Sequence, residues 1–341
     1  MYERFHPSKA ASRASIAEQF GVRGVRQLAR DLGTILSHMA SSSAPPVDPT
    51  VVGHFRPSMS LPAYAGLKPV SGIAPIMNFF DRAGGGRGFR RIVTKRTARD
   101  WRGGRLTYDE HDGTDFVCPP RTPIVAAAPG VLVATRDSFL RGGLTACVDH
   151  GGGVVTQYTH LTRVVAEIGQ PLARGEVLAW SGTGGLDMVS GFPWVPPHVH
   201  FMAWVDGMPV DPYRLPDDAA QRVRWLHGND PETSGERTSD VRPRTLADVS
   251  VDEAAVERGV ASCKSSAIRA ELERATHPAT RLAIFEDSLH HDRDAWPDGL
   301  FGTRMRPAAG EIVQLTLPLP IAGYRAARAH DGMFSKPRQP R

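Results

Sequence analysis

The chain has 341 residues, 41% of them hydrophobic and 23% charged, an ordinary globular composition for one or two domains with extensions. Its net charge of +5 suits an anionic partner such as cell-wall polymer, phospholipid or nucleic acid without selecting one. No zinc-finger, helix-turn-helix or RNA-binding motif occurs, so we expect no nucleic-acid partner. No apolar run is long enough to span a membrane, and residues 1–9 lack the basic-then-apolar pattern of a secretory signal.

The N-terminal segment, residues 1–40, is predicted to be helical. Over residues 16–39 apolar side chains recur at helical spacing, with arginines among the other positions. We expect this apolar face to pack against the protein's own core. A basic amphipathic helix in peripheral contact with a membrane is the alternative. The apolar positions are Val25, Leu28, Ala29, Leu32, Ile35, Leu36 and Met39.

The next segment, residues 41–104, is predicted to be a Pro/Gly-rich linker or a loosely draped segment. Its first part, residues 41–76, is rich in Ser, Pro and Gly, and the run Gly84-Gly-Gly-Arg-Gly88 makes a further break. This glycine run precedes no strand–helix pattern of the phosphate-loop type, so we assign it no phosphate role.

Residues 105–215 carry the clearest pattern, in which short β-rich runs alternate with Gly, Pro and Asp turns. Short strands at such intervals predict an antiparallel all-β domain. The predicted strands are Ile124–Ala128, Gly130–Thr135, Leu144–Val148, Gly153–Tyr158, Val177–Trp180 and Val199–Val205.

The chain has three cysteines, of which Cys118 and Cys147 lie in or beside the apolar runs. We interpret these two as small buried hydrophobic residues. A disulfide between them is the alternative for an exported protein, although the odd third residue, Cys263, argues against a disulfide scaffold.

Beyond the β-rich segment, residues 216–245 are predicted to be a polar connector and residues 246–341 a helical C-terminal region. Ser250 and Glu253 have the spacing of a capping box, which predicts a helix from there to about residue 274. The other predicted elements are a second helix over 278–290, a strand over 312–317 and a disordered tail over 335–341.

The β-rich segment holds a set of residues suited to a hydrolytic zinc site: His111, Asp115, His160, His198 and His200. Residues i and i+2 on a strand point the same way, so the last two imidazoles should project together, one to bind metal and its neighbour to move protons. A carboxylate and two neutral imidazoles hold Zn²⁺ with one position open, and the remaining imidazoles can act on protons beside it.

The other histidines are not assigned to this site. His290 and His291, near two aspartates, are read as a solvated helix end, although a metal site is the alternative. His150 precedes a glycine and is read as a turn residue, and His227 lies in the polar connector.

Residues 105–215 resemble the lysostaphin/LytM-type zinc metallopeptidases. The resemblance rests on several motifs in the order that this family has them. They are His111-Asp-Gly-Thr-Asp-Phe116, Pro123-Ile-Val-Ala-Ala-Ala-Pro-Gly-Val131, Val148-Asp-His-Gly-Gly-Gly153, Tyr158-Thr-His-Leu161, Gly169-Gln-Pro-Leu-Ala-Arg-Gly175, Ser181-Gly-Thr-Gly184 and Pro197-His-Val-His-Phe201.

The resemblance implies a mainly β fold, with an antiparallel core that carries a zinc groove and with helical and irregular extensions at both ends. It implies that His111, Asp115 and His200 bind Zn²⁺, that His198 is the general base, and that His160 orients water and stabilises the oxyanion. The implied substrate is a peptide of bacterial peptidoglycan, and the implied location is the cell envelope or outside the cell.

Two alternatives to such an enzyme stay open. The first is a non-catalytic LytM-type module that binds cell wall or activates another hydrolase. Such modules typically lose ligands, whereas all the positions named above are present here. The second is a metallohydrolase such as a D-alanyl carboxypeptidase, ranked last because its first His and Asp are further apart.

The chain departs from the family pattern in a longer approach to the last motif, residues 185–198. Phe192 and Trp194 in this stretch are predicted either to wall a substrate subsite or to pack the loop down. Upstream segments in some family members occlude the zinc through an asparagine. Asn78 is therefore a candidate for such latency.

Overall fold

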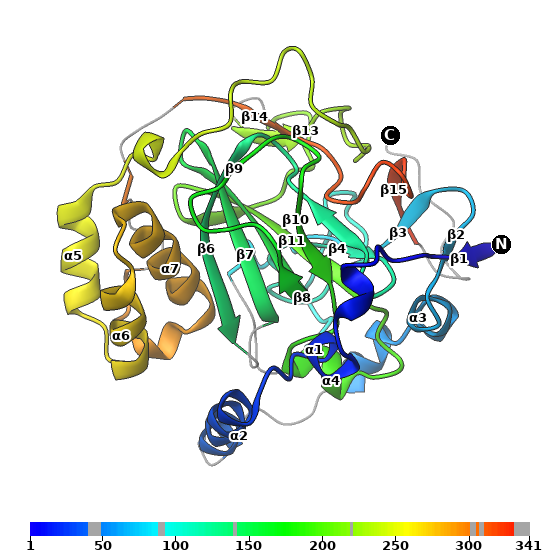
Figure 1. Cartoon of the computed structure of the whole chain (residues 1–341), viewed down its shortest axis with the longest axis horizontal. Helices are drawn as coiled ribbons and strands as arrows, with labels where there is room; N and C mark the ends of the chain where they lie inside the picture. Colours follow the sequence, from blue (N-terminus) through cyan, green and yellow to red (C-terminus); the bar gives the residue numbers. More distant parts are fainter. Residues whose placement is uncertain are drawn as a thin grey trace.

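A computed structural model describes residues 1–39, 49–87, 93–138, 142–218, 221–300, 305–306 and 310–330 (Figure 1). Within these residues a sheet of eleven strands forms the centre of the molecule, in the order β15-β3-β4-β11-β8-β7-β6-β9, with β10, β5 and β12 paired beside it. The strands are β3 (Ile73–Asn78), β4 (Thr114–Val117), β5 (Pro123–Val125), β6 (Gly130–Ser138), β7 (Gly143–Gly151), β8 (Val154–Val164), β9 (Pro171–Leu172), β10 (Val177–Ser181), β11 (His198–Val205), β12 (Met208–Val210) and β15 (Ala326–Ala329).

The mainly β class that the sequence predicts is confirmed, and the pairs between strands of the 105–215 segment are antiparallel, as predicted. The sheet as a whole is mixed, because β15 joins β3 in parallel. Two small sheets accompany it: β1 (Tyr2–Arg4) pairs antiparallel with β2 (Leu67–Pro69), and β13 (Val223–Trp225) pairs parallel with β14 (Val313–Leu315).

The helices lie in the extensions, except for one inside the β-rich segment. They are α1 (Ile16–Gln19), α2 (Val25–Met39), α3 (Pro57–Tyr64), α4 (Leu186–Ser190), α5 (Glu253–Ala261), α6 (Ser266–Arg274) and α7 (Pro278–His291). Helices α5, α6 and α7 lie together beside β6 and β7 (Figure 1), and their apolar residues share one core with those strands. No helix in the described part of the chain is long and apolar enough to cross a membrane.

Both faces of the central sheet are buried, and strand alternation divides its side chains between two cores. On β11, Met202 and Trp204 belong to the core under α5–α7, whereas Phe201 and Ala203 belong to the core on the opposite face. His200 is two residues before Met202, so it projects from the face that the C-terminal helices cover. This placement decides which extension reaches the candidate site.

The predicted linker, residues 41–104, contains part of the sheet instead. Strand β3 pairs with β4 and β15, and Ile76 and Phe79 are fully buried in the core. The Pro and Gly content misled the prediction because a short strand needs only a few apolar residues when neighbouring strands supply its partners. Residues 41–48 and 88–92 lie outside the described residues.

The N-terminal segment differs from the prediction in its packing. The helix predicted over 16–39 is divided into α1 and α2 by a turn that contains Gly21 at φ 80°. Val25, on the predicted apolar face, is 84% exposed, so the expected packing against the core is wrong there. A polar contact anchors the segment, since Arg23 Nη1 lies 2.7 Å from Asp137 Oδ2 on β6.

The C-terminal helices are close to their predicted positions, with two differences. Helix α5 begins after Asp252, whose side chain accepts a hydrogen bond from Ala255 N, so the predicted cap at Ser250 is wrong by two residues. The single helix predicted to reach residue 274 is divided into α5 and α6, because Ser265 forms a separate N-cap for α6. The three cysteines are buried and free, as small hydrophobic residues, and the alternative Cys118–Cys147 disulfide is absent.

Candidate metal centre

A row of residues crosses the sheet at the candidate site. Strand register places Asn78 on β3 opposite Asp115 on β4, Asp115 opposite His200 on β11, and His200 opposite Thr159 on β8. Side chains directly opposite each other in antiparallel strands have their Cβ atoms about 5 Å apart. Residues separated by 37, 85 and 41 positions in sequence are thereby neighbours.

The predicted ligands converge on one point. His111 Nε2 lies 3.1 Å from His200 Nδ1, and Asp115 Oδ1 lies 2.8 Å from that same His200 atom and 3.3 Å from His111 Nε2. All three side chains are buried. Two ring nitrogens that face each other beside a carboxylate form a donor set that suits Zn²⁺, which prefers nitrogen and oxygen ligands in a tetrahedral arrangement.

The outer nitrogens of both ligand imidazoles are held by hydrogen bonds. His111 Nδ1 lies 2.6 Å from the carbonyl oxygen of Phe79, which can only accept, so this nitrogen carries the hydrogen and Nε2 is turned to the ligand group. His200 Nε2 donates in the same way to Asp112 Oδ1 at 2.9 Å, which turns Nδ1 inward. Such partners fix the tautomer and the ring orientation of metal-ligating histidines.

Position 113 requires glycine because the loop lies very close to β11, not because of its backbone angles. Its φ is not in the left-handed region. A Cβ added there would lie 2.5 Å from the carbonyl oxygen of Phe201 and 2.9 Å from Cε1 of His200. The loop from His111 to Asp115 can therefore lie against β11 only without a side chain at this position.

The electrostatics of the ligand group favour charged carboxylates. Burial alone raises the pKa of Asp115, but His111 and His198 nearby outweigh it and leave that pKa well below its usual value. Burial lowers the pKa of His200, whereas the hydrogen bonds to Asp112 and Asp115 raise it to about 10. A cation is thus favoured at this point, and a metal ion would take the place of the His200 proton.

His198 lies beside the ligand group, and its Nε2 faces that group. Its Nδ1 donates to the carbonyl oxygen of Pro196 at 2.7 Å, and its Nε2 lies 3.5 Å from Asp115 Oδ1. Burial lowers the pKa of His198 to about 4. The imidazole is therefore neutral at neutral pH, the state in which Nε2 can accept a proton.

A β-bulge turns His160 toward the same point. The register of β7 and β8 shifts between Leu144 and Ala146, and His160 has the left-handed φ of 61°. Its Nδ1 donates to the carbonyl oxygen of Gly184 at 2.8 Å, and its ring centroid lies 4.8 Å from that of His198. The structure therefore brings the three predicted metal ligands and both predicted catalytic histidines together.

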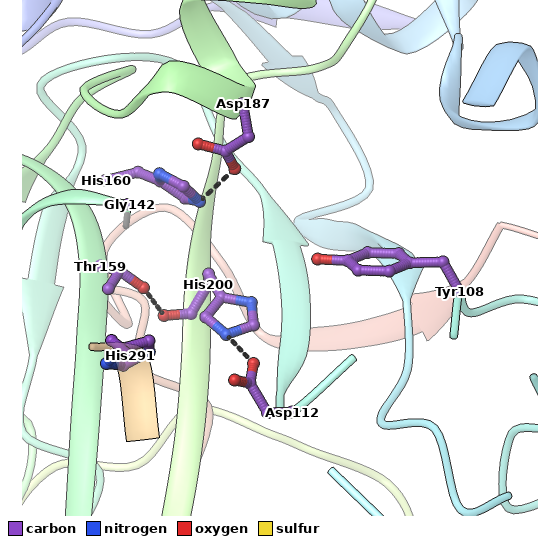
Figure 2. Close-up of a pocket in the computed structure, with 8 residues that line it drawn as sticks. All are labelled: Tyr108, Asp112, Gly142, Thr159, His160, Asp187, His200 and His291. Carbon is purple, nitrogen blue, oxygen red and sulfur yellow. Dashed lines mark hydrogen bonds and ion pairs between the residues drawn. The ribbon is translucent and has the colours of Figure 1, made fainter. Parts of the chain in front are cut away.

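A pocket of about 40 Å³ opens beside these residues. Figure 2 shows His160 and Asp187 on one side of it, His200 and Asp112 on the other, and the Tyr108 hydroxyl pointing in from the loop before His111. This volume admits a water molecule but no peptide, so a substrate would have to lie across the mouth of the pocket.

Sequence reasoning missed some residues that line the pocket. Asp187 lies on α4, in the longer approach to the last motif, with Oδ2 3.6 Å from His160 Nε2. Asp112 sits inside the first motif, and its charge next to His111 was the signal that could have identified it. Tyr108 is three residues before His111, but a single tyrosine carries no such signal.

His290 and His291 are not a solvated helix end, contrary to the prediction. They are 2% and 8% exposed, because α7 continues to His291 and lies over the sheet face that carries His200. His290 Nε2 lies 2.6 Å from Asp112 Oδ2, and His291 lines the pocket with its Nδ1 2.9 Å from Asp287 Oδ1. The helical pattern predicted the helix, but not which face of the sheet it covers.

His150 is likewise a buried strand residue and not a turn residue. It lies near the end of β7, with Nδ1 2.8 Å from the carbonyl oxygen of Pro129 and Nε2 2.7 Å from Thr156 Oγ1. The adjacent glycine that suggested a turn, Gly151, ends the strand and has φ 83°.

The loop with Phe192 and Trp194 is held by the N-terminal extension. Phe192 makes edge-to-face contacts with Phe20 and Tyr64 at centroid distances of 5.4 and 4.9 Å, and it remains 48% exposed. Trp194 is 46% exposed, and its carbonyl oxygen accepts from Arg56 N at 2.8 Å. Neither side chain lines the pocket.

Asn78 contacts a predicted ligand directly. Its Nδ2 donates to Asp115 Oδ2 at 2.7 Å, on the carboxylate oxygen that faces away from His111 and His200. Its Oδ1 is buried and has no hydrogen-bond partner among the described residues. The predicted linker therefore supplies two contacts to the ligand group, Asn78 to Asp115 and the Phe79 carbonyl to His111.

Residues 109–212 match the sequence model of peptidase family M23. The peptidoglycan DD-endopeptidase ShyA of Vibrio cholerae serotype O1 is 36% identical over 101 residues, which are 30% of this chain and 22% of that protein. The DD-carboxypeptidase/endopeptidase Mpg of Neisseria meningitidis serogroup B is 31% identical over 108 residues, 31% of this chain and 23% of that protein. The chain thus matches less than a quarter of the length of these relatives.

Among solved structures, the catalytic domain of lysostaphin from Staphylococcus simulans is 26% identical and covers 30% of this chain and 75% of that one, with a TM-score of 0.26. A zinc-containing peptidase from Vibrio cholerae is 27% identical and covers 40% of this chain and 39% of that one, with a TM-score of 0.27. The sequence match confirms the resemblance for residues 109–212, and the extensions lie outside it.

Proposed function

Because residues 109–212 form a domain of peptidase family M23, we propose that this protein is a zinc-dependent endopeptidase of bacterial peptidoglycan. It hydrolyses peptide bonds in cross-bridges or stem peptides. The observation that carries the proposal is the convergence of His111 Nε2, His200 Nδ1 and Asp115 Oδ1, with both outer ring nitrogens held by acceptors. The names of the relatives support the substrate class, since ShyA is a peptidoglycan DD-endopeptidase.

In this proposal His111, Asp115 and His200 hold one Zn²⁺ and leave one position open to the pocket. The chemistry that zinc supplies when bound is Lewis-acid activation of water and of a peptide carbonyl. The carboxylate and the two neutral imidazoles keep the net charge of the ligand set low, so that this Lewis acidity is retained. The protein's other groups then only have to orient the reactants and move protons.

His198 is the proposed general base. Its Nδ1–H is committed to Pro196, and its neutral Nε2 faces the ligand group, so it can take a proton from the attacking water. His160 is the proposed partner that orients water and stabilises the oxyanion. Its Nδ1–H donates to Gly184, so its Nε2, near Asp187, can accept a hydrogen bond from water, and it can donate to the oxyanion once it carries a proton.

A peptide substrate would lie across the mouth of the pocket, and we propose Phe192 and Trp194 as walls of a subsite. Both rings are about half exposed on the loop that begins with α4. The cell envelope or the extracellular space is the proposed location, because peptidoglycan lies there. The alternative of a non-catalytic module that binds wall or activates another hydrolase is less favoured, since every proposed ligand and both proton-handling imidazoles are present.

The proposal is tested with the purified full chain, loaded with zinc and incubated with isolated peptidoglycan. We expect about one zinc per chain and release of new muropeptides, which a chelator stops and added zinc restores. His198→Ala should abolish release and keep its zinc, whereas loss of zinc in this variant would mean that His198 and His200 have exchanged roles. Zinc-loaded protein that releases nothing from any wall chemotype, yet activates a second hydrolase, would establish the non-catalytic alternative.

A further inference from the structure

We propose that His290, at the end of the C-terminal helix α7, is a positioning residue of the metal centre. It holds Asp112, and Asp112 in turn fixes His200 in the orientation that a metal ligand needs. The inference rests on the proposed function for the metal itself, but it concerns a residue 78 positions beyond the end of the family match at residue 212. It makes the C-terminal extension part of the site.

The contacts form a continuous chain from the helix to the ligand. His290 Nε2 lies 2.6 Å from Asp112 Oδ2, and Asp112 Oδ1 lies 2.9 Å from His200 Nε2. Each carboxylate oxygen thus accepts from one imidazole N–H, and the remaining nitrogen of His200 faces Asp115 and His111. A hydrogen-bonded carboxylate behind a ligand imidazole fixes its tautomer and strengthens it as a ligand.

Because Asp112 is buried, its carboxylate needs both hydrogen-bond donors. Asp112 and His290 are both buried, and a buried carboxylate that loses one of its donors keeps the cost of desolvation without the compensating hydrogen bond. The side chain would then turn toward another donor, and its hold on His200 would be lost. Asp112 lies in the loop before β4, outside the paired residues of that strand.

The fold explains why α7 reaches this point. His200, Met202 and Trp204 alternate onto the sheet face that α5–α7 cover, and the ring of Trp204 lies 5.9 Å from that of His290. Two buried ion pairs fix the helix on the sheet, Arg136 with Asp287 and Arg306 with Glu286, and Arg306 also binds Asp149 on β7. The helix end is thus held at the site independently of His290.

A second metal ion is the competing explanation, because Asp112, His290 and His291 also form a compact group of metal-ligating side chains. The hydrogen bonds favour the positioning role. Both oxygens of Asp112 are taken by imidazole N–H groups, and His291 Nδ1 is held by Asp287 at 2.9 Å. In the ligand group of His111, Asp115 and His200, by contrast, two ring nitrogens face each other at 3.1 Å, which calls for a cation between them.

The test compares His290→Leu with His290→Gln in the full chain. Glutamine places an N–H donor near the position of Nε2, whereas leucine keeps the bulk and removes the donor. We expect His290→Leu to raise the zinc dissociation constant roughly 10-fold or more, the range for the loss of such a supporting contact, and His290→Gln to stay near the parent. Competition with a chromophoric chelator measures the constant, and the visible spectrum of the Co²⁺-loaded protein reports the ligand geometry without any turnover.

Two controls separate positioning from a general loss of structure. His150→Leu removes another buried imidazole, outside the contacts of the metal centre, and should leave zinc affinity and the Co²⁺ spectrum unchanged. Asp112→Asn tests the same chain of contacts from the other side. In the double variant Asp112→Asn/His290→Leu the losses of affinity should not add, because both substitutions break one path.

These experiments distinguish a failure of the inference from a failure of the proposed function. A parent protein without zinc or peptidase activity would overturn the proposed function. Parent protein with one tight zinc, together with unchanged zinc affinity and an unchanged Co²⁺ spectrum in folded His290→Leu, would overturn the inference alone. Two zinc ions per chain in the parent and one in His290→Leu would replace it by the second metal site. If His290→Leu does not fold, unchanged zinc affinity and an unchanged Co²⁺ spectrum in folded Asp112→Asn would overturn it instead.

Discussion

Asp115 and His200 face each other across the β4–β11 pair, with Asp115 Oδ1 2.8 Å from His200 Nδ1. Their register is fixed by the alternation of the flanking residues, since Phe116 and Phe201 must both enter the core on the opposite face. A shift of one residue in either strand would turn its predicted ligand to the opposite face of the sheet. The geometry of the candidate metal centre is therefore set by the same packing that stabilises the sheet.

The first prediction concerns metal removal. A ligand that binds only the folded state stabilises it by about 2.7 kcal/mol at a free concentration 100 times its dissociation constant. We expect zinc to raise the melting temperature of the parent and to have no such effect on Asp115→Asn, which keeps the shape but weakens the ligand. Calorimetry with and without chelator measures the shift, and an equal shift in both proteins would place the zinc elsewhere.

The second prediction concerns the close approach of Gly113 to β11. A methyl group there would push the ring of His200, so Gly113→Ala should lose zinc affinity and peptidase activity while the protein remains folded. Gly235→Ala is the matched control, since an added Cβ at that position meets no atom within 4 Å. Equal zinc affinity in the two variants would show that the loop can move away without cost.

The third prediction concerns Asn78. If its hydrogen bond braces Asp115, Asn78→Ala should weaken zinc binding by roughly 10-fold and lower activity. If Asn78 instead keeps the enzyme latent, as some family members suggest, the same variant should be more active with unchanged zinc affinity. The contact to the outer oxygen of Asp115 favours the brace, and muropeptide release together with zinc titration distinguishes the two results.

The fourth prediction concerns Asp187, whose Oδ2 lies 3.6 Å from His160 Nε2. Replacing the carboxylate by an amide removes its attraction for an imidazolium and loosens the orientation of His160. Asp187→Asn should therefore lower kcat several-fold, with little change in zinc affinity, and should lose less than His160→Ala. A kcat of Asp187→Asn at the parent level would remove Asp187 from the catalytic arrangement.

The fifth prediction concerns acid stability and His150. Burial lowers the pKa of this imidazole to about 4, so the folded state resists its protonation while the unfolded chain binds the proton near pH 6.5. Its contribution to stability is present above pH 6.5 and is lost as the pH falls toward 4. His150→Asn should flatten the fall in the free energy of unfolding in this window, by up to about 3 kcal/mol, as denaturant titrations at several pH values would measure. A parallel pH profile in parent and variant would contradict it.

Much of the candidate site could be predicted because its parts are local in sequence. His198 and His200 share a strand face by alternation, and His111 with Asp115 flank a glycine in one short motif. The resemblance also predicted that these residues converge in space, because the motifs occur in the order that the family has. The extensions were less predictable, because the short strand β3 and the polar connector strand β13 depend on partners far away in the chain.

Residue patterns along the chain were enough to predict the β-rich segment, its candidate ligands and its resemblance to a peptidase, since alternation and motif spacing are properties of neighbouring residues. The surroundings of the candidate ligands depend on long-range packing. It brought the Phe79 carbonyl and Asn78 from a predicted linker to His111 and Asp115, and it brought His290 from a predicted solvated helix end to Asp112. Each of these contacts joins elements that are remote in sequence. The face of the sheet on which each extension packs depends on how both faces of the sheet are buried, and no local sequence pattern encodes that choice.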